Sequence, residues 1–177
     1  MTPEEFDALF DSFASTVSRL ETLPAYDVGG DEADRLAAAR AGTPRPLRSV
    51  STSPWLTRIA IQTIQQGKVW TRVRVLDDPL TDYESAELIS YGEAQAVGEV
   101  VRIALRADVP GDVSDFWLFD AGLPGEHAVL MSYDAEGHWL GADLCTDPAT
   151  LANLRNQLEE VLARTVSLNE FLAGRRG

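Results

Sequence analysis

Residues 69–106 read VWTRVRVLDDPLTDYESAELISYGEAQAVGEVVRIALR, and this stretch decides the fold class. Over residues 69–76 the side chains alternate in kind with the two-residue period of a β-strand. Pro79 ends the strand, a helix over residues 81–91 follows, and residues 99–106 are the next strand candidate. A connection of this length predicts a right-handed parallel crossover between the two strands.

The helix between these strands carries its own end signals. Thr81 and Glu84 form a capping box, in which each side chain accepts a hydrogen bond from the other residue's backbone N–H. Gly92 is expected to end the helix directly after Tyr91.

Further strands follow toward the C-terminus. Candidates cover residues 116–120, 128–134 and 139–145, and residues 135–137 form a tight turn between the last two. Because short turns join these strands, we expect them to be antiparallel. A long helix then starts at Asp147–Pro148, and Ser167 with Glu170 caps a final short helix.

The N-terminal residues are typical of a helix. Thr2 is the expected N-cap, with Pro3 in the first turn and Glu5 completing a capping box. Apolar residues then recur at helical spacing and predict one continuous apolar stripe: Phe6, Leu9, Phe10, Phe13, Val17 and Leu20.

These patterns predict one α+β domain over residues 1–177, with a mixed central sheet of about five strands and flanking helices. Residues 1–42 would form an N-terminal helical arm. Residues 43–53, which include Pro44 and Pro46, would be a linker, and residues 54–177 the α+β core.

Composition excludes several classes of protein. Hydrophobic residues make up 45% and charged residues 24%, which are ordinary globular values. No apolar run approaches the roughly 20 residues needed to cross a bilayer. The single cysteine, Cys145, excludes a disulfide framework and favours the cytoplasm. A net charge of -13 repels nucleic acid and anionic lipid, so we expect neither as a direct partner.

Arg72 and Arg74 are the first candidate binding residues, because they share one face of their strand. Such a pair can hold a phosphate or a carboxylate through bidentate contacts. The alternative is a structural role, in which they form ion pairs with carboxylates such as Glu87 or Glu99.

Tyr83 and Glu87 are further candidates. They lie one helical turn apart behind the strand-to-helix loop at residues 79–83, and loops at the carboxyl ends of strands are where open α/β sheets bind ligands. Glu87 can be a general base or a plain surface residue of the helix.

The string DFWLFD at residues 115–120 is the most unusual one. Apolar residues on both of its faces predict a central strand, with Trp117 and Phe119 packed under a helix and Phe116 and Leu118 on the opposite face. Asp115 and Asp120 at its ends either mark a site or are turn residues.

Other chemistries find little support. The spacing of His127, His138 and Cys145 matches no zinc signature, and Cys145 adjoins no cationic cluster that would activate it as a nucleophile. The sequence has no phosphate-binding glycine motif and no nucleophile elbow. We therefore expect no metal, no cofactor and no catalytic group.

Taken together, several strings resemble an uncharacterised actinobacterial family, domain-of-unknown-function family 6879. They are RVRV at 72–75, PLTDY at 79–83, Glu87, Gly98–Glu99, DFWLFD at 115–120, RLE at 19–21 before Tyr26, the 133–137 hairpin and the Asp147–Pro148 helix. The resemblance covers nearly the whole chain. It implies a cytoplasmic protein of Streptomyces-like bacteria, encoded beside helix-turn-helix regulators and small acidic partner proteins, and it implies no particular activity.

The order of elements from residue 69 onward is also similar to one half of a phospholipase D-like domain. Such domains occur without catalysis as effector-sensing parts of transcription regulators. Their catalytic pattern is H-x-K-x-x-x-x-D. With Asp120 as its acid, Val113 and Asp115 stand at the histidine and lysine positions, so this likeness implies no phosphodiesterase activity.

Three functions remain open. The first is a non-enzymatic regulatory or interaction domain that binds a partner protein, such as a helix-turn-helix regulator, and senses a small ligand. The second is an enzyme acting on a small anionic substrate, with Arg72 and Arg74 holding the charge and Glu87, Glu99 or Asp115 as acid or base. The third is a toxin–antitoxin component. The sequence leaves the oligomeric state open, a homodimer included.

Overall fold

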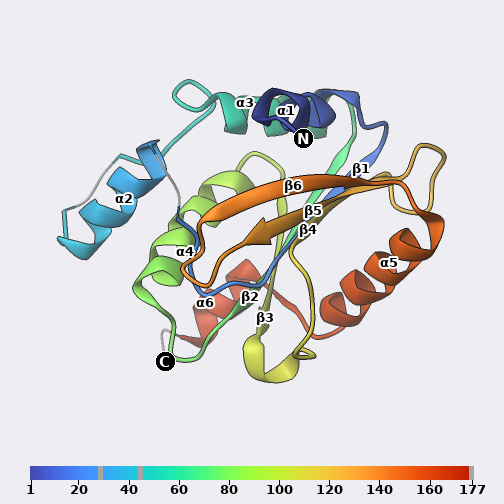
Figure 1. Ribbon diagram of the computed structural model, residues 1–177. Helices are drawn as coiled ribbons and strands as arrows, with labels where there is room; N and C mark the ends of the chain where they lie inside the picture. Colours follow the sequence, from blue (N-terminus) through green and yellow to red (C-terminus); the bar gives the residue numbers. More distant parts are fainter. Residues whose placement is uncertain (28–29, 44–45, 176–177) are drawn as a thin grey trace.

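The computed structural model describes residues 1–27, 30–43 and 46–175. Pro44, which belongs to the predicted linker, lies outside these residues. Within them, strands form one mixed sheet of seven in the order β6-β5-β4-β1-β2-β3-β7 (Figure 1). The strands are β1 (Thr16–Glu21), β2 (Val69–Leu76), β3 (Val100–Leu105), β4 (Phe116–Phe119), β5 (His127–Tyr133), β6 (Trp139–Cys145) and β7 (Val166–Ser167).

Helices precede, separate and follow these strands. They are α1 (Pro3–Ser12), α2 (Gly30–Arg40), α3 (Pro54–Ala60), which continues as a π-helical turn over Ile61–Gln65, α4 (Asp82–Gln95), α5 (Pro148–Leu162) and α6 (Leu168–Gly174), with a 3-10 turn at Arg106–Asp108. The capping boxes predicted at Thr2, Thr81 and Ser167 are all present. The α+β class with one mixed sheet is confirmed.

Strand directions follow the predicted connections. β2 and β3 are parallel and joined through α4, whereas β4, β5 and β6 are antiparallel neighbours. The sheet has seven strands where the sequence predicted about five, because β1 and β7 were not predicted. β7 has two residues, which is too short to show a two-residue period in a sequence.

The N-terminal helix is shorter than predicted. α1 ends at Ser12, and β1 begins at Thr16 and lies between β2 and β4 near the middle of the sheet. The prediction of one helix through Leu20 and of a helical arm over residues 1–42 is therefore wrong. Val17 and Leu20 fit a helical stripe by spacing, yet they are buried on opposite faces of a strand.

The predicted end of α4 is also wrong. The helix continues past Gly92 to Gln95, and the chain turns at Gly98, which has a φ of 109°. A Cβ at Gly98 would lie 2.5 Å from Thr63 Oγ1, so this position needs glycine for space as well as for backbone conformation. Gly92 has no positive φ and faces open space, so nothing there stops the helix.

Each face of the sheet packs against its own helices. On one face, Leu20, Val73, Phe116 and Leu118 form a buried cluster with the apolar side of α5. On the other face, Phe10 of α1 packs among strand residues and α3, and α4 covers β3 (Figure 1). The expectation that the 116–120 strand, β4, is interior is confirmed, and its side chains divide between the two faces as predicted. The strand ends at Phe119, one residue earlier than predicted, because Asp120 has a φ of 51°.

The described part of the predicted linker forms no strand. Arg48 anchors it to α4, because its backbone N–H and its Nε each donate to Glu93 at 2.7 Å. This contact places Arg48 beside the sheet face that carries α1 and α3.

Candidate functional site

A cavity of about 510 Å³ lies on the sheet face that carries α1, α3 and α4. We call it the sheet-face cavity. Its floor consists of side chains from β1, β2, β4 and β5, and its walls come from the three helices, from the loop around Tyr26 and from Trp139. The lining therefore brings together residues that are far apart in the sequence.

One end of the sheet-face cavity is aromatic. The Phe10 ring lies edge-to-face with Trp117 at 4.7 Å and with Trp55 at 5.1 Å between ring centroids. All three residues line the cavity, and they come from α1, β4 and α3. The three rings pack against one another and give this end of the cavity an apolar wall.

Arg72 of β2 lines the floor of the cavity. Its Nε donates to Glu99 Oε1 at 3.1 Å, and its Nη1 donates to Glu21 Oε1. Its guanidinium carbon is 5.6 Å from the centre of the Trp117 ring and 5.5 Å from that of Tyr91. Ion pairs and ring faces together hold this largely buried cation in one orientation.

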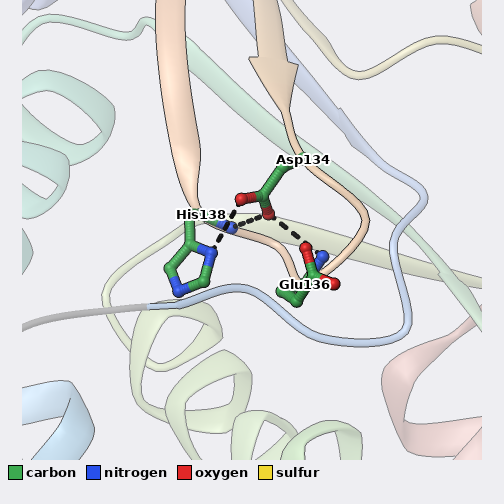
Figure 2. A group of neighbouring side chains, drawn as sticks. All are labelled: Asp134, Glu136 and His138. Carbon is green, nitrogen blue, oxygen red and sulfur yellow. Dashed lines mark hydrogen bonds and ion pairs between the residues drawn. The ribbon is translucent and has the colours of Figure 1, made fainter.

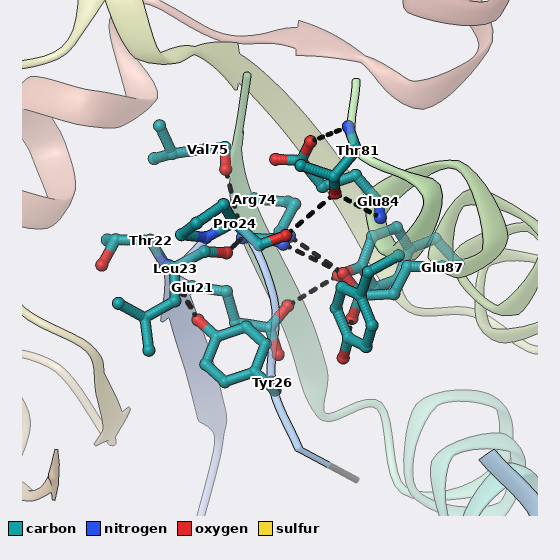
Figure 3. Close-up of polar contacts among 12 residues, drawn as sticks. Glu21, Thr22, Leu23, Pro24, Tyr26, Arg74, Val75, Thr81, Glu84 and Glu87 are labelled. Atoms are coloured by element: carbon teal, nitrogen blue, oxygen red, sulfur yellow. Dashed lines mark hydrogen bonds and ion pairs between the residues drawn. The ribbon is translucent and has the colours of Figure 1, made fainter. Parts of the chain in front are cut away.

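Arg74 lies two residues further along β2 and is fully buried. Figure 3 shows it between Glu87 of α4 and the backbone carbonyls of Leu23 and Val75. Its Nε and Nη2 are both 3.1 Å from Glu87 Oε2, and Tyr83 donates to the other oxygen of Glu87 at 3.0 Å. The structural alternative for the arginine pair is therefore present, with Glu99 and Glu87 as the partners.

The third buried arginine of this face, Arg19 of β1, was not predicted. Its Nη2 donates to Asp115 Oδ1 at 2.9 Å and to the hydroxyl of Tyr133 at 3.3 Å. It lies directly beside Arg72 in the strand register. Because residues 13–20 have helical spacing, periodicity could not reveal Arg19. The only signal was the family motif RLE at residues 19–21.

Asp115 supports the loop that closes one side of the cavity. The Tyr26 hydroxyl donates to Asp115 Oδ1 and accepts the backbone N–H of Thr22 at 3.0 Å. The hydroxyl of Thr22 donates to Asp115 as well. Asp115 does not line the cavity, but it positions both Arg19 and Tyr26, which do.

The predicted site residues separate into groups. Arg72, Tyr83, Glu87 and Glu99 line the sheet-face cavity. Arg74 and Asp115 lie behind it and bind lining residues. Asp120 lies elsewhere, where its carboxylate accepts backbone N–H groups at the start of β1. A role in binding remains a prediction for the residues that the fold gathers, and Asp120 is a structural residue in this geometry.

Burial and charge act in opposite directions on the carboxyl groups of the floor. Burial opposes the ionisation of Glu21, but Arg72, Arg19 and Arg74 outweigh it, so the pKa of Glu21 is lowered. Burial raises the pKa of Glu99, and its ion pair with Arg72 offsets only part of that rise. Glu99 Oε2 and Arg19 Nη1 are buried and have no hydrogen-bond partner among the described residues.

The β5–β6 hairpin carries a separate group of potential metal ligands, Asp134, Glu136 and His138 (Figure 2). Asp134 Oδ1 accepts the backbone N–H groups of Glu136 and His138 at 3.0 and 2.8 Å, and its Oδ2 lies 2.8 Å from His138 Nδ1. These contacts are those of a tight turn, and they account for the cluster without an ion.

The same hairpin touches the loop around Tyr26. The N–H of Asp27 donates to the carbonyl of Gly137 at 2.9 Å, and a Cβ at Gly137 would lie 2.5 Å from the carbonyl oxygen of Ala25. The predicted turn at residues 135–137 therefore has a second function, because it supports one rim of the sheet-face cavity.

The fold and the site define an α+β protein with one mixed sheet and a charged, aromatic-walled cavity on one face of it. The chain matches the model of the family described as Domain of unknown function (DUF6879) over residues 4–173. It belongs to this family, as its motifs predicted. A comparison with curated proteins found no match. Within the described part of the chain, no helix is both long and apolar enough to span a membrane.

Proposed function

We propose that this chain is a non-enzymatic regulatory domain that binds a small ligand in the sheet-face cavity and relays its presence to a partner protein. The observation that carries the proposal is the cavity itself. Its volume of about 510 Å³ falls within the usual range for small-molecule sites, and its lining combines aromatic walls with a few fixed polar groups.

The state of the charged groups favours binding over catalysis. Arg19, Arg72 and Arg74 each form ion pairs with buried carboxylates, so these carboxylates are engaged in holding the floor together. The lining residues include neither a histidine nor a cysteine among the described part of the chain. Carboxylates held in ion pairs are less available as general acids or bases, which favours binding over catalysis.

The walls offer a physical route for a signal. A ligand in the cavity would contact α1 through Phe10, α3 through Trp55 and α4 through Tyr91. These helices pack on the sheet from outside, so a ligand that fits one arrangement of them selects that arrangement. A partner that reads their outer surface, such as a helix-turn-helix regulator, would respond to the ligand.

The proposal is tested by comparing fragment binding to the natural chain with fragment binding to a variant whose cavity is filled. Ser90 of α4 lines the cavity and is only partly buried, so Ser90→Phe would place a ring inside it. Ser85→Phe adds the same ring at an exposed position on the same helix and outside this cavity. A fragment library containing neutral, anionic and cationic compounds is titrated against the three proteins by calorimetry.

We expect at least one fragment class to bind the natural chain and the Ser85→Phe chain equally. Its affinity for the Ser90→Phe chain should fall about tenfold or more, because a ring that fills the site excludes the ligand. If no fragment binds, or if Ser90→Phe binds as tightly as the natural chain, the ligand-binding proposal is wrong.

An enzyme acting on a small anionic substrate is the second candidate. One observation favours it, since Arg72 and Glu99 share the cavity and the pKa of Glu99 is raised by burial, as a general acid or base requires. Mass spectrometry of bound fragments after long incubation separates the two functions. A regulatory domain returns each ligand unchanged, and an enzyme yields a product that Glu99→Gln abolishes.

The relation to phospholipase D-like half domains is also a proposal, and it carries no catalytic role. The residue aligned with the catalytic acid, Asp120, accepts backbone N–H groups of Ala14, Ser15 and Thr16. What supports the proposal is the effector-sensing role of degenerate domains of that kind, which agrees with a ligand-binding cavity.

The partner is tested separately. This chain is co-expressed with a helix-turn-helix regulator encoded beside it, and the mixture is separated by size-exclusion chromatography. The two proteins should elute as a complex, and the stability of that complex should change when a fragment that binds the cavity is added. A regulator that elutes apart from this chain under every ligand condition would contradict the relay.

A further inference from the structure

The outermost strand of the sheet, β6, leaves one of its two sides without a neighbouring strand among the described residues (Figure 1). Two of its leucines are well exposed, Leu140 at 67% and Leu144 at 52%. The strand contains no proline, lysine or arginine, which are the residues that commonly keep an edge strand from pairing. Such an edge is a template for a further strand.

The free edge of β6 offers backbone donors and acceptors. The N–H of Met131 in β5 donates at 3.0 Å to the residue that precedes β4, so the backbone groups of Met131 point away from β6. Successive residues of a strand direct these groups to opposite sides, so those of Leu130 point to β6, where Asp143 lies opposite. The backbone groups of Asp143 therefore point to β5, and those of Ala142 and Leu144 point outward.

The β-bulge of the β5–β6 ladder affects only one end of this edge. It lies between Ser132 and Tyr133, and Leu140 has no residue opposite it on β5. From Gly141 to Cys145 the ladder is regular. The outward groups of this part of β6 are therefore spaced as an added antiparallel strand requires.

The order of side chains along β6 is self-complementary. In an antiparallel pairing of two copies centred on Ala142, Leu140 of each copy lies opposite Leu144 of the other. The two Ala142 residues exchange both of their N–H···O bonds, because their backbone groups point outward. Asp143, the only charged residue of the strand, then lies opposite Gly141 and not opposite its own copy.

The neighbouring registers are less favourable. A pairing centred on Asp143 places two carboxylates directly opposite each other, and like charges in that position destabilise a sheet. A pairing centred on Gly141 places Leu144 opposite His138, which lies outside the strand. The pairing centred on Ala142 therefore combines the two leucines and separates the charges.

We infer that this chain forms a two-fold symmetric dimer, in which β6 of one copy pairs antiparallel with β6 of the other around Ala142. The dimer covers the exposed leucines and joins the two sheets into one. The inference goes beyond the proposed function, because it needs no ligand in the sheet-face cavity. The contact is small and each copy has a net charge of -13, so the dimer is a weak one that salt strengthens.

Sedimentation equilibrium of the natural chain measures the association. In about 300 mM NaCl, which screens the repulsion between copies, we expect a dimer with a Kd on the order of 10–100 µM. Samples from about 5 to about 500 µM cover this range. Lowering the NaCl concentration to about 30 mM should weaken the dimer.

A lysine on the edge tests the position of the interface. Leu144→Lys places a charge against the apolar Leu140 of the second copy and should weaken the dimer about tenfold or more. Val100→Lys is the matched control, because Val100 is an apolar strand residue of similar exposure, 46%, on β3. Four strands separate β3 from β6 in the sheet, so this variant should dimerise as the natural chain does.

Disulfide formation tests the register in a Cys145→Ser background, which removes the natural thiol. In the proposed pairing, the positions of Leu140→Cys and Leu144→Cys lie opposite each other, roughly 5.5 Å apart between Cα atoms, which a disulfide can bridge. Two copies of either variant alone hold their thiols about 14 Å apart. Mild oxidation should therefore crosslink an equal mixture of the two variants and leave each variant alone largely monomeric on a non-reducing gel.

Each measurement can overturn the inference. A natural chain that stays monomeric at every concentration does so. A dimer that Leu144→Lys and Val100→Lys weaken equally has its interface elsewhere, and crosslinks that form in one variant alone as readily as in the mixture show another register. Melting curves confirm that the variants are folded. If Leu144→Lys does not fold, the sedimentation of the natural chain and the crosslinking decide.

Discussion

The side chain of Asp120 helps to fix the boundary between α1 and β1, which lies more than 100 residues earlier in the sequence. Its carboxylate accepts the N–H groups of Ala14 and Ser15 at 2.7 Å and that of Thr16 at 3.0 Å. These amides would otherwise continue α1. Asp120 has a φ of 51°, a left-handed conformation that aspartate and asparagine tolerate better than other residues.

We predict that Asp120→Ala lowers the free energy of unfolding by about 2–3 kcal/mol, because it removes these acceptors and adds left-handed backbone strain. Asp120→Asn should lose less, since it keeps one acceptor oxygen and the tolerance for this φ. Urea unfolding of both variants measures the difference. Equal stability of all three proteins would contradict the assignment.

This contribution should depend on pH. Burial raises the pKa of Asp120, but the three backbone N–H groups outweigh burial, so the folded-state pKa lies below the ordinary 3.8. A carboxyl with a lowered folded-state pKa stabilises the protein above its unfolded pKa and ceases to do so as the pH falls through the folded value. The stability gap between the natural chain and Asp120→Asn should therefore narrow below about pH 3.8.

Gly137 is a second single-residue constraint. Its φ is 87°, and an added Cβ would meet the carbonyl oxygen of Ala25 at 2.5 Å. Gly125 has a similar φ of 90° with nothing within 4 Å, so it is a matched control. Gly125→Ala should cost about 1–2 kcal/mol of stability through backbone strain alone. Gly137→Ala should cost clearly more in the same urea titrations, and equal costs would show that the contact with Ala25 does not matter.

At the scale of elements, β4 is the strand on which both faces of the sheet depend. Phe116 and Leu118 belong to the cluster under α5, and Trp117 and Phe119 belong to the cluster with α1. All four are buried. Trp117 also lines the sheet-face cavity, so the strand joins the core to the candidate site.

We predict that Trp117→Ala costs about 3–5 kcal/mol, the usual cost of truncating a buried aromatic residue. That is a large part of the roughly 5–15 kcal/mol that holds a native domain together. Trp139 lies on the edge strand β6 and is 43% exposed, so Trp139→Ala should cost far less. Thermal melts followed by circular dichroism compare the two. A folded Trp117→Ala chain with an unchanged Tm would move this residue from core to recognition surface.

At the scale of the whole molecule, the excess of negative charge lies mainly on the surface. The chain has 15 basic and 28 acidic residues. The network under the cavity takes about as many carboxylates as arginines from the surface, since it pairs Arg19, Arg72 and Arg74 with Glu21, Glu87, Glu99 and Asp115. The surface therefore keeps its excess of carboxylates, which repel one another in the folded state.

We predict that raising NaCl from about 10 mM to about 300 mM increases Tm by a few degrees, because salt screens the exposed carboxylates and leaves the buried pairs largely unscreened. Scanning calorimetry in NaCl and in KCl of equal ionic strength measures the effect and excludes a specific sodium ion. A Tm that falls with salt would mean that surface ion pairs outweigh the repulsion.

Part of the candidate site could be predicted from local sequence patterns, and part could not. Local patterns pointed to several of the residues that the fold brings together: Arg72, Arg74, Tyr83, Glu87 and Glu99. The sequence named Glu87 and Glu99 as possible partners of the arginines, and the structure shows which pairs form, Arg72 with Glu99 and Arg74 with Glu87. Arg19 and Glu21 were missed. They belong to β1, whose apolar spacing matches a helix.

By itself, the sequence determined β2, the crossover through α4, the antiparallel hairpins and the helix caps, because each depends on residues close together in the chain. Only the tertiary structure decided that residues 16–21 form a strand. β1 gains its hydrogen bonds from β2 and β4, and Asp120 captures the amides that would extend α1. The sheet-face cavity depends on that strand, since Arg19 and Glu21 join its floor only when β1 lies in the sheet.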